Sequence, residues 1–366
     1  MKKKIGVILT VMSVCLSVFA IIISTCYAAP VIAGVSGIYK DGQVVTLTGS
    51  GFSSNTAVGT SNLEFLGGTG GPINSGIIGA EFSRINWDID TEWGYDVQNS
   101  TDNCFFGSKC LQMVYVSGSY DPEAPLYYKL PSPVTSSDRL FISWWEMTTW
   151  TGNGQYKILR LSPTETIIDS PGNQDVYFFH NNSGAVTYGI DGGPYALYPS
   201  FSPALPKSTW TRTDIDIKTS TPNSVSITKY TPGSSVKTTS ASSYSSGAGN
   251  SEWNWIVWQN YFGTDGAGQM TAGSVWFEDM FVQHGSSARV ELCDSSTWSS
   301  RKSCFIQPPT SWGSTIGVTL NQGTFTGGAI ACLYVIDASG NVSNGHAITI
   351  GSGSAAAAGP KVTSVQ

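Results

Sequence analysis

Short β-rich runs alternate with breaks of Gly, Pro, Ser and Asn along the whole chain, and helical periodicity is nearly absent. Short runs bounded by such turn residues are typical of β-strands in sandwiches and barrels. The 366 residues also exceed the length of one ordinary domain. The sequence therefore predicts an all-β protein with two sandwiches of different size.

The smaller sandwich is predicted from two segments at opposite ends of the chain, residues 30–55 and 286–351. In the first segment, the turn pair Asp41-Gly42 separates two β-rich runs, which is a hairpin signal. The two segments together have roughly the length of one immunoglobulin-like sandwich. Each segment can instead be read as an independent hairpin, but isolated hairpins are rarely stable. We therefore expect the two ends to pair.

Short motifs in these segments resemble a known family. Gly49-Ser-Gly-Phe52 after Val44-Val-Thr-Leu-Thr is similar to the opening of an IPT/TIG domain, and Val342-Ser-Asn before a last strand is similar to its end. The resemblance implies one discontinuous immunoglobulin-like domain. Residues 56–285 would then be an inserted domain.

This middle segment contains nine strand candidates, enough for a two-sheet jelly roll. They are Leu111–Val116, Leu126–Leu130, Leu140–Met147, Tyr156–Leu161, Val176–His180, Trp210–Lys218, Ser224–Tyr230, Trp253–Trp258 and Ser274–Val282. Ser143-Trp-Trp-Glu, Trp210-Thr-Arg and Val275-Trp-Phe-Glu-Asp-Met-Phe-Val resemble strands of the concanavalin A-like lectin/glucanase superfamily, including polysaccharide-lyase-like jelly rolls. The resemblance implies a jelly roll that binds sugars on a concave face, and it supports the fold more than an activity.

The first 29 residues read as an export signal. Lys2, Lys3 and Lys4 precede an uncharged apolar run from Ile5 to Ile23, and small residues follow. The run is long for a cleaved signal, so a retained membrane anchor is the rival interpretation. Cleavage would release a secreted or cell-surface protein, and the compact Lys-rich signal is typical of bacteria. Residues 352–366 are predicted to be a disordered tail.

Charge and composition restrict the partners. Removing the three signal lysines leaves 16 of the 19 basic side chains against 25 acidic ones, a net charge near −9. Nucleic acid and anionic lipid both need a basic footprint, so neither is expected as a partner. Only 12% of the residues are charged, while Gly, Ser, Thr, 12 Trp and 16 Tyr are abundant. This composition suits a glycan or polysaccharide, and protein contacts at a cell surface are the alternative.

Cysteine spacing indicates an oxidising compartment. Cys104 and Cys110 are close in sequence, as are Cys293 and Cys304, and both spacings suit local disulfides. Cys332 is left over in an apolar run, where a buried free thiol is expected.

The candidate ligand contacts follow from strand alternation. Trp253 and Trp255 share one face of their strand, and Trp144 shares a face with Glu146. Aromatic rings on a concave face can stack on sugars, and Arg160 can bind a carboxylate. Core packing of the rings, and a structural pairing of Arg160 with Glu146, are the alternatives.

An enzymatic interpretation is weaker, and we expect no catalysis. A polysaccharide lyase needs a base and a group that neutralises the uronate, and His180, Tyr156 and Arg160 supply these types. Alternation places Arg160 on the same face as Tyr156. The alginate-lyase and glucanase signatures are missing, and the adjacent carboxylates at 278 and 279 are expected to point to opposite sheets.

No cofactor is certain, although a structural calcium is possible. Asp88, Asp90 and Glu92 place three carboxylates at alternate positions, and Asp279 is a second candidate. The full pattern of a calcium-binding loop is absent. The sequence thus predicts a non-catalytic, exported carbohydrate-binding protein, with a polysaccharide lyase or glycosidase and a structural adhesin as alternatives.

Overall fold

The computed structural model describes most of the predicted strands and turns of the chain. The described residues are 28–52, 63–66, 87–89, 96–100, 103–106, 110–115, 126–135, 138–149, 151–152, 155–162, 176–180, 186–190, 206–219, 224–242, 253–263, 270–271 and 273–354. They form β-strands and one short 3-10 helix, Trp298–Ser300. The prediction of an all-β protein is confirmed.

The larger lobe contains two main sheets. The eight-stranded sheet has the order β15-β14-β13-β8-β18-β6-β5, with β3 paired to β18. Its strands are β3 (Leu63–Leu66), β5 (Asp96–Ser100), β6 (Cys110–Tyr115), β8 (Arg139–Thr148), β13 (Thr211–Lys218), β14 (Ser224–Tyr230), β15 (Lys237–Ser242) and β18 (Gly273–His284).

The second main sheet is six-stranded, with the order β12-β11-β10-β16-β7-β4. Its strands are β4 (Trp87–Ile89), β7 (Leu126–Val134), β10 (Gln155–Ser162), β11 (Val176–His180), β12 (Val186–Ile190) and β16 (Trp253–Gly263). A small ribbon pairs β9 (Thr151–Gly152) with β17 (Met270–Thr271). Each of the nine strands predicted for residues 56–285 overlaps one of the observed strands.

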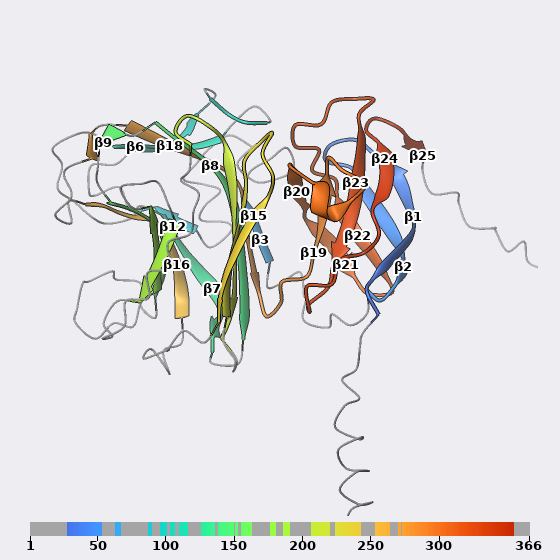
Figure 1. Ribbon diagram of the computed structural model, residues 1–366, viewed down its shortest axis with the longest axis horizontal. Helices are drawn as coiled ribbons and strands as arrows, with labels where there is room; N and C mark the ends of the chain where they lie inside the picture. Colours follow the sequence, from blue (N-terminus) through green and yellow to red (C-terminus); the bar gives the residue numbers. More distant parts are fainter. Residues whose placement is uncertain are drawn as a thin grey trace, which may run out of the picture.

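The smaller lobe is a sandwich of a five-stranded and a four-stranded sheet, with the orders β21-β22-β2-β1-β25 and β20-β19-β23-β24. Its strands are β1 (Val31–Ile38), β2 (Val44–Ser50), β19 (Arg289–Cys293), β20 (Cys304–Gln307), β21 (Pro309–Trp312), β22 (Thr315–Thr319), β23 (Ile330–Ile336), β24 (His346–Thr349) and β25 (Gly353–Ser354). Figure 1 shows this lobe beside the larger one, and it contains both the first and the last described strands, β1 and β25.

Strands from the two ends of the chain share a sheet. β2 pairs with β22 in antiparallel register, so that Val45 lies opposite Val318 and Leu47 opposite Ile316. These four side chains are fully buried in one apolar cluster that includes residues from both ends. Gly49 permits the β1–β2 hairpin, because a Cβ at this position would lie 1.9 Å from the Val31 carbonyl oxygen. The domain boundaries and the resemblance to an IPT/TIG domain stay predictions.

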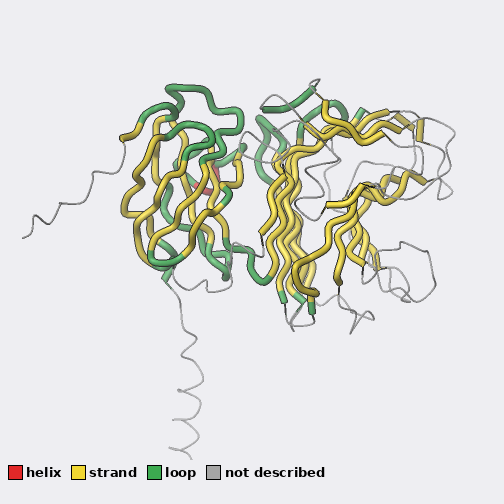
Figure 2. Tube along the Cα trace, turned by 180° about the vertical axis from the view of Figure 1, so that it is seen from behind, coloured by secondary structure: helices red, strands yellow, loops and turns green. Residues whose placement is uncertain are grey.

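The eight-stranded sheet lies between the six-stranded sheet and the smaller lobe, as both views show (Figures 1 and 2). On the side of the smaller lobe, Trp145 of β8 stacks on Phe305 of β20 with a centroid distance of 5.4 Å. The two residues belong to an apolar cluster that also holds Tyr334 and Ile336 of β23. The two lobes therefore share a core.

Both predicted disulfides are present, Cys104–Cys110 and Cys293–Cys304. Cys332 is a buried free thiol, as expected. The segment from Lys2 to Ile23 and most of the predicted tail lie outside the described residues. Within the described part of the chain, no helix has the length and apolar character needed to cross a membrane.

Candidate functional site

The register of the six-stranded sheet places several predicted ligand residues on one face. On β10, Arg160 lies opposite Val257 of β16, and Ser162 lies opposite Trp255. Leu159 and Leu161 alternate with these positions and are fully buried. Because residues that are paired across strands share a face, position 160 and Trp255 lie on the face opposite to the two leucines.

A β-bulge in β10 changes the expected alternation. Lys157 pairs with Phe179 of β11, but Leu159 pairs with Phe178, so one extra residue is accommodated between them. The bulge moves Tyr156 to the face opposite to Arg160, although uninterrupted alternation predicts the same face. Tyr156 lies directly opposite His180 of β11. The register thus pairs two members of the predicted lyase set and separates the third.

The described tryptophans of β16 differ in exposure. Trp255 is half-buried, whereas Trp253 is only 5% exposed. A half-buried indole on a sheet face still offers part of its ring to a ligand. Trp255 is therefore the strongest of the predicted stacking residues, and ligand contact by both rings remains a prediction.

Trp144 and Glu146 lie on a different sheet from Arg160. Both belong to β8 of the eight-stranded sheet and are 0% and 1% exposed. The Thr213 hydroxyl of β13 donates to Oε1 of Glu146 at 3.5 Å. The structure therefore divides the predicted contact set, with Arg160, Trp253 and Trp255 on the six-stranded sheet and Trp144 and Glu146 on the eight-stranded one.

Lys229, a buried lysine near Glu146, was not among the candidate residues predicted from the sequence. Lys229 of β14 lies opposite Thr213 and is 6% exposed, and among the described residues its Nζ has no hydrogen-bond partner. Burial lowers the pKa of Lys229 to about 8, and the charge of Glu146 partly opposes this shift. Alternation within Ser224–Tyr230 is the sequence signal for its inward position, because Val225 and Ile227 share its face.

The metal candidates do not form one site. Asp88 lies in β4, and Asp90 and Glu92 lie outside the described residues. Asp279 is 3% exposed, and its Oδ2 accepts a hydrogen bond of 2.6 Å from Nδ2 of Asn321. Burial raises the pKa of Asp279 to about 8, although Asn321 and Arg212 oppose the rise. A structural calcium stays a prediction.

A second bulge, in β18, places two carboxyls at the junction of the lobes. The register with β8 shifts between Glu278 and Phe281, and Asp279 has a φ of 48°. Oε1 and Oε2 of Glu278 accept backbone hydrogen bonds from Phe105 at 2.7 Å and Phe106 at 3.2 Å. Glu278 therefore contacts the Cys104–Cys110 loop, and Asp279 contacts Asn321 of the smaller lobe. Both contacts lie at the junction of the lobes, so the prediction that the two carboxylates point to opposite sheets is wrong.

The same junction contains a buried ionic cluster. Arg212 of β13 contacts Asp214 at 2.7 Å and Glu291 of β19 at 3.2 Å, and all three are nearly inaccessible. Arg289 contacts Glu291 at 2.5 Å. Burial alone would raise the pKa of Glu291, but Arg212 and Arg289 prevail and lower it to about 2. This cluster joins the lobes and does not offer a free charge to a ligand.

Comparisons with known proteins give only distant likenesses. No family model matches the sequence, and no curated protein matches it. Among solved structures, an endo-β-1,4-glucuronan lyase from the fungus Trichoderma reesei is similar, with 15% identity, coverage of 60% of this chain and 94% of that chain, and a TM-score of 0.40. A lectin solved with galactose has 11% identity, coverage of 55% and 97%, and a TM-score of 0.32. An alginate lyase has 11% identity, coverage of 51% and 86%, and a TM-score of 0.31. At these values the comparisons assign neither a family nor a function.

Proposed function

We propose that the protein is an exported, non-catalytic carbohydrate-binding protein, and that the face of the six-stranded sheet with Arg160 and Trp255 is its ligand-binding surface. The observation that carries the proposal is the register, which brings a guanidinium position and a half-buried indole to neighbouring strands of one face. Indole rings stack on the CH-rich faces of sugars, and a guanidinium binds a carboxylate or hydroxyl groups.

The composition supports the same ligand class. With 12% charged residues and a formal net charge of −6, the composition does not favour a polyanion such as nucleic acid as the ligand. Its two disulfides are consistent with an extracellular setting. Neutral or weakly acidic glycans are therefore the proposed ligands, and the smaller lobe serves as the base from which the larger lobe is presented.

The test is retention of the mature protein, residues 30–366, on a broad glycan array, first with calcium and then with a chelator. We expect binding that survives chelation, and we expect Trp255→Ala to reduce it at least about tenfold, which corresponds to the ~1.4 kcal/mol of a stacking contact. Trp298→Ala is the matched control, because Trp298 is also a half-buried indole but lies in the smaller lobe.

The other outcomes separate the alternatives. Binding that is lost on chelation would replace ring stacking by a metal-dependent lectin site. Release of new reducing or unsaturated ends, lost in His180→Ala, would establish a lyase or glycosidase and use the His180–Tyr156 pair. Self-association without glycan retention would support the structural adhesin. A large fall in the melting temperature of Trp255→Ala would assign that ring to the core.

A further inference from the structure

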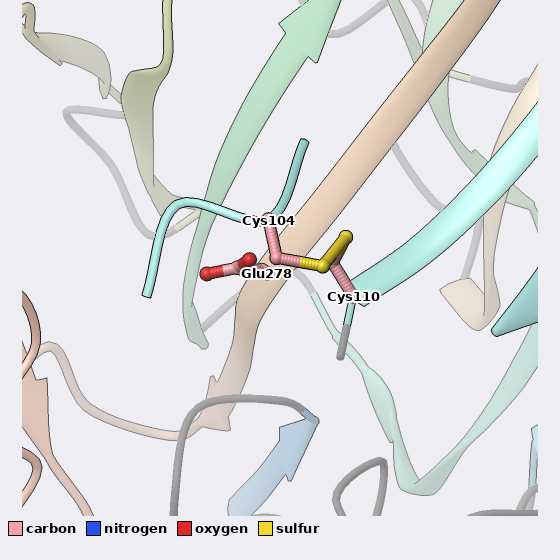
Figure 3. A group of neighbouring side chains, drawn as sticks. All are labelled: Cys104, Cys110 and Glu278. Carbon is pink, nitrogen blue, oxygen red and sulfur yellow. A yellow bond between two sulfur atoms is a disulfide. The ribbon is translucent and has the colours of Figure 1, made fainter. Parts of the chain in front are cut away.

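Two disulfides of this protein each lie beside a buried glutamate. Cys104, Cys110 and Glu278 offer two sulfur atoms and a carboxylate oxygen within 4.8 Å of one another (Figure 3). Cys293, Cys304 and Glu291 form a second group with the same composition and the same spacing limit. Cysteine thiolates and a carboxylate are ligand types of tetrahedral zinc sites, and the two sulfur atoms of each group become available as thiolates once the disulfide is opened.

The two groups differ in how the glutamate charge is balanced. Glu291 contacts the guanidinium groups of Arg212 and Arg289, so its charge is already neutralised. Glu278 is fully buried, and its hydrogen bonds in the described part of the chain come from the uncharged backbone amides of Phe105 and Phe106. Among the residues that the structure describes, no cation contacts Glu278, whereas Glu291 already has two, so a bound cation has more to offer the Glu278 group.

We infer that Cys104, Cys110 and Glu278 form a latent site for a thiophilic divalent cation such as Zn²⁺, which becomes available when the Cys104–Cys110 disulfide is reduced. An external dithiol supplies the two electrons: its two S–H groups become a disulfide, and the protein disulfide becomes two thiols. On metal binding both thiols release their protons to solvent. Two thiolates and one carboxylate then bind the ion, and water is left as the fourth ligand.

The structure also indicates which disulfide is reduced first. Cys104 is half-buried, whereas Cys293 and Cys304 are both 0% exposed in the shared core. Thiol–disulfide exchange requires access of the attacking thiolate to a sulfur atom. Mild reduction of the folded protein therefore opens Cys104–Cys110 and leaves the second disulfide closed.

The experiment reduces the purified mature protein with a phosphine, which converts a disulfide and water into two thiols and a phosphine oxide. Alkylation and peptide mass spectrometry identify the opened disulfide. Co²⁺ is then added as the probe, and thiolate-to-cobalt charge-transfer absorbance is recorded, followed by displacement with Zn²⁺. We expect one Co²⁺ per chain after reduction and none before it.

Two variants assign the ligands. Cys104→Ser with Cys110→Ser should abolish the absorbance, and Glu278→Gln should weaken Co²⁺ binding at least about tenfold, since even an outer-shell change costs that much. Glu278→Gln keeps an oxygen acceptor for one of the two backbone amides, of Phe105 or Phe106, and its melting temperature while oxidised shows whether it folds.

Three results would overturn the inference. The first is absence of charge-transfer absorbance when alkylation shows that Cys104 and Cys110 are free. The second is equal Co²⁺ affinity in folded Glu278→Gln, which would remove the carboxylate from the site. The third is opening of Cys293–Cys304 before Cys104–Cys110, or absorbance that persists in the double serine variant.

Discussion

At the scale of single residues, Arg212 connects the two lobes by an ion pair and a hydrogen bond. Its guanidinium is 1% exposed, contacts Asp214 and Glu291, and donates to the Cys304 carbonyl at 2.8 Å. The buried charges compensate one another, so removing Arg212 takes away the ion partner of Asp214 and leaves Glu291 with Arg289 alone. The pair of Arg212 with Glu291 joins residues 79 positions apart, and no local sequence pattern predicts it.

We predict that Arg212→Met lowers the free energy of unfolding by about 3–5 kcal/mol, because it removes the ion partner of the buried Asp214 and one of the two guanidinium groups beside Glu291. Arg139→Met is the control: Arg139 also pairs with an aspartate, Asp216, but the two side chains are 24% and 22% exposed. Its ion pair should contribute at most about 1 kcal/mol. Urea unfolding at pH 7 measures both, and equal losses would contradict the prediction.

Lys229 predicts a specific pH dependence. Its pKa is about 8 in the folded protein, because of burial, and 10.5 in the unfolded chain. Between these two pH values the unfolded state binds the Lys229 proton more strongly than the folded state does. The contribution of neutral Lys229 to the free energy of unfolding is therefore full above pH ~10.5 and is lost as the pH falls to ~8. Relative to Lys229→Met, the free energy of unfolding of the wild type should therefore rise by on the order of 3 kcal/mol from pH ~8 to ~10.5.

Urea unfolding of both proteins across that pH range tests the linkage. Other groups titrate equally in the wild type and the variant, so only the difference between the two free energies is interpreted. A difference that stays constant with pH would show that Lys229 keeps its ordinary pKa when folded.

At the scale of elements, strand positions were predictable and strand irregularities were not. Apolar and β-branched runs bounded by turn residues identified β8, β10, β13, β16 and β18, because burial of one face imposes a period of two. The bulges in β10 and β18 depend on how neighbouring strands are paired, which local composition does not encode. For this reason the sequence placed Arg160 with Tyr156 and separated Glu278 from Asp279.

The β18 bulge makes a prediction of its own. Asp279 has a φ of 48°, a region that Asn and Asp tolerate better than other residues with a Cβ. Asp279→Asn keeps this tolerance and an acceptor for Asn321, whereas Asp279→Ala loses both. We expect the alanine variant to be at least about 1 kcal/mol less stable than the asparagine variant. Chemical denaturation at pH 7 distinguishes them, and equal stabilities would show that the bulge rearranges.

At the scale of the whole molecule, the two lobes behave as one unit. Phe305 contacts Trp145 and Phe106 of the larger lobe, and the ionic cluster of Arg212 lies in the same junction. A sequence can indicate two sandwiches, but the shared core depends on which outer faces meet. The ligand face was predicted only in part for the same reason. Trp144 and Trp255 look alike in the sequence, and only the structure shows that they belong to different sheets.

We predict a single unfolding transition for the mature, oxidised protein. The Arg212–Glu291 ion pair and the contacts of Phe305 with Trp145 and Phe106 both cross the junction, so separating the lobes would expose buried charge and apolar surface together. Urea unfolding followed in parallel by tryptophan fluorescence and near-ultraviolet circular dichroism should give coincident curves. Two separated transitions would show that the lobes unfold independently.

The pairing of β2 with β22 also has a consequence for the order in which the strands are synthesised and paired. The β1–β2 hairpin is synthesised before its sheet partner, Thr315–Thr319, which follows more than 260 residues later. Contacts between positions so distant in sequence form slowly, because loop closure must precede them. β1 and β2 therefore leave the ribosome well before β22 can pair with them, and until then the unpaired edge of β2 stays open to other chains unless a chaperone covers it.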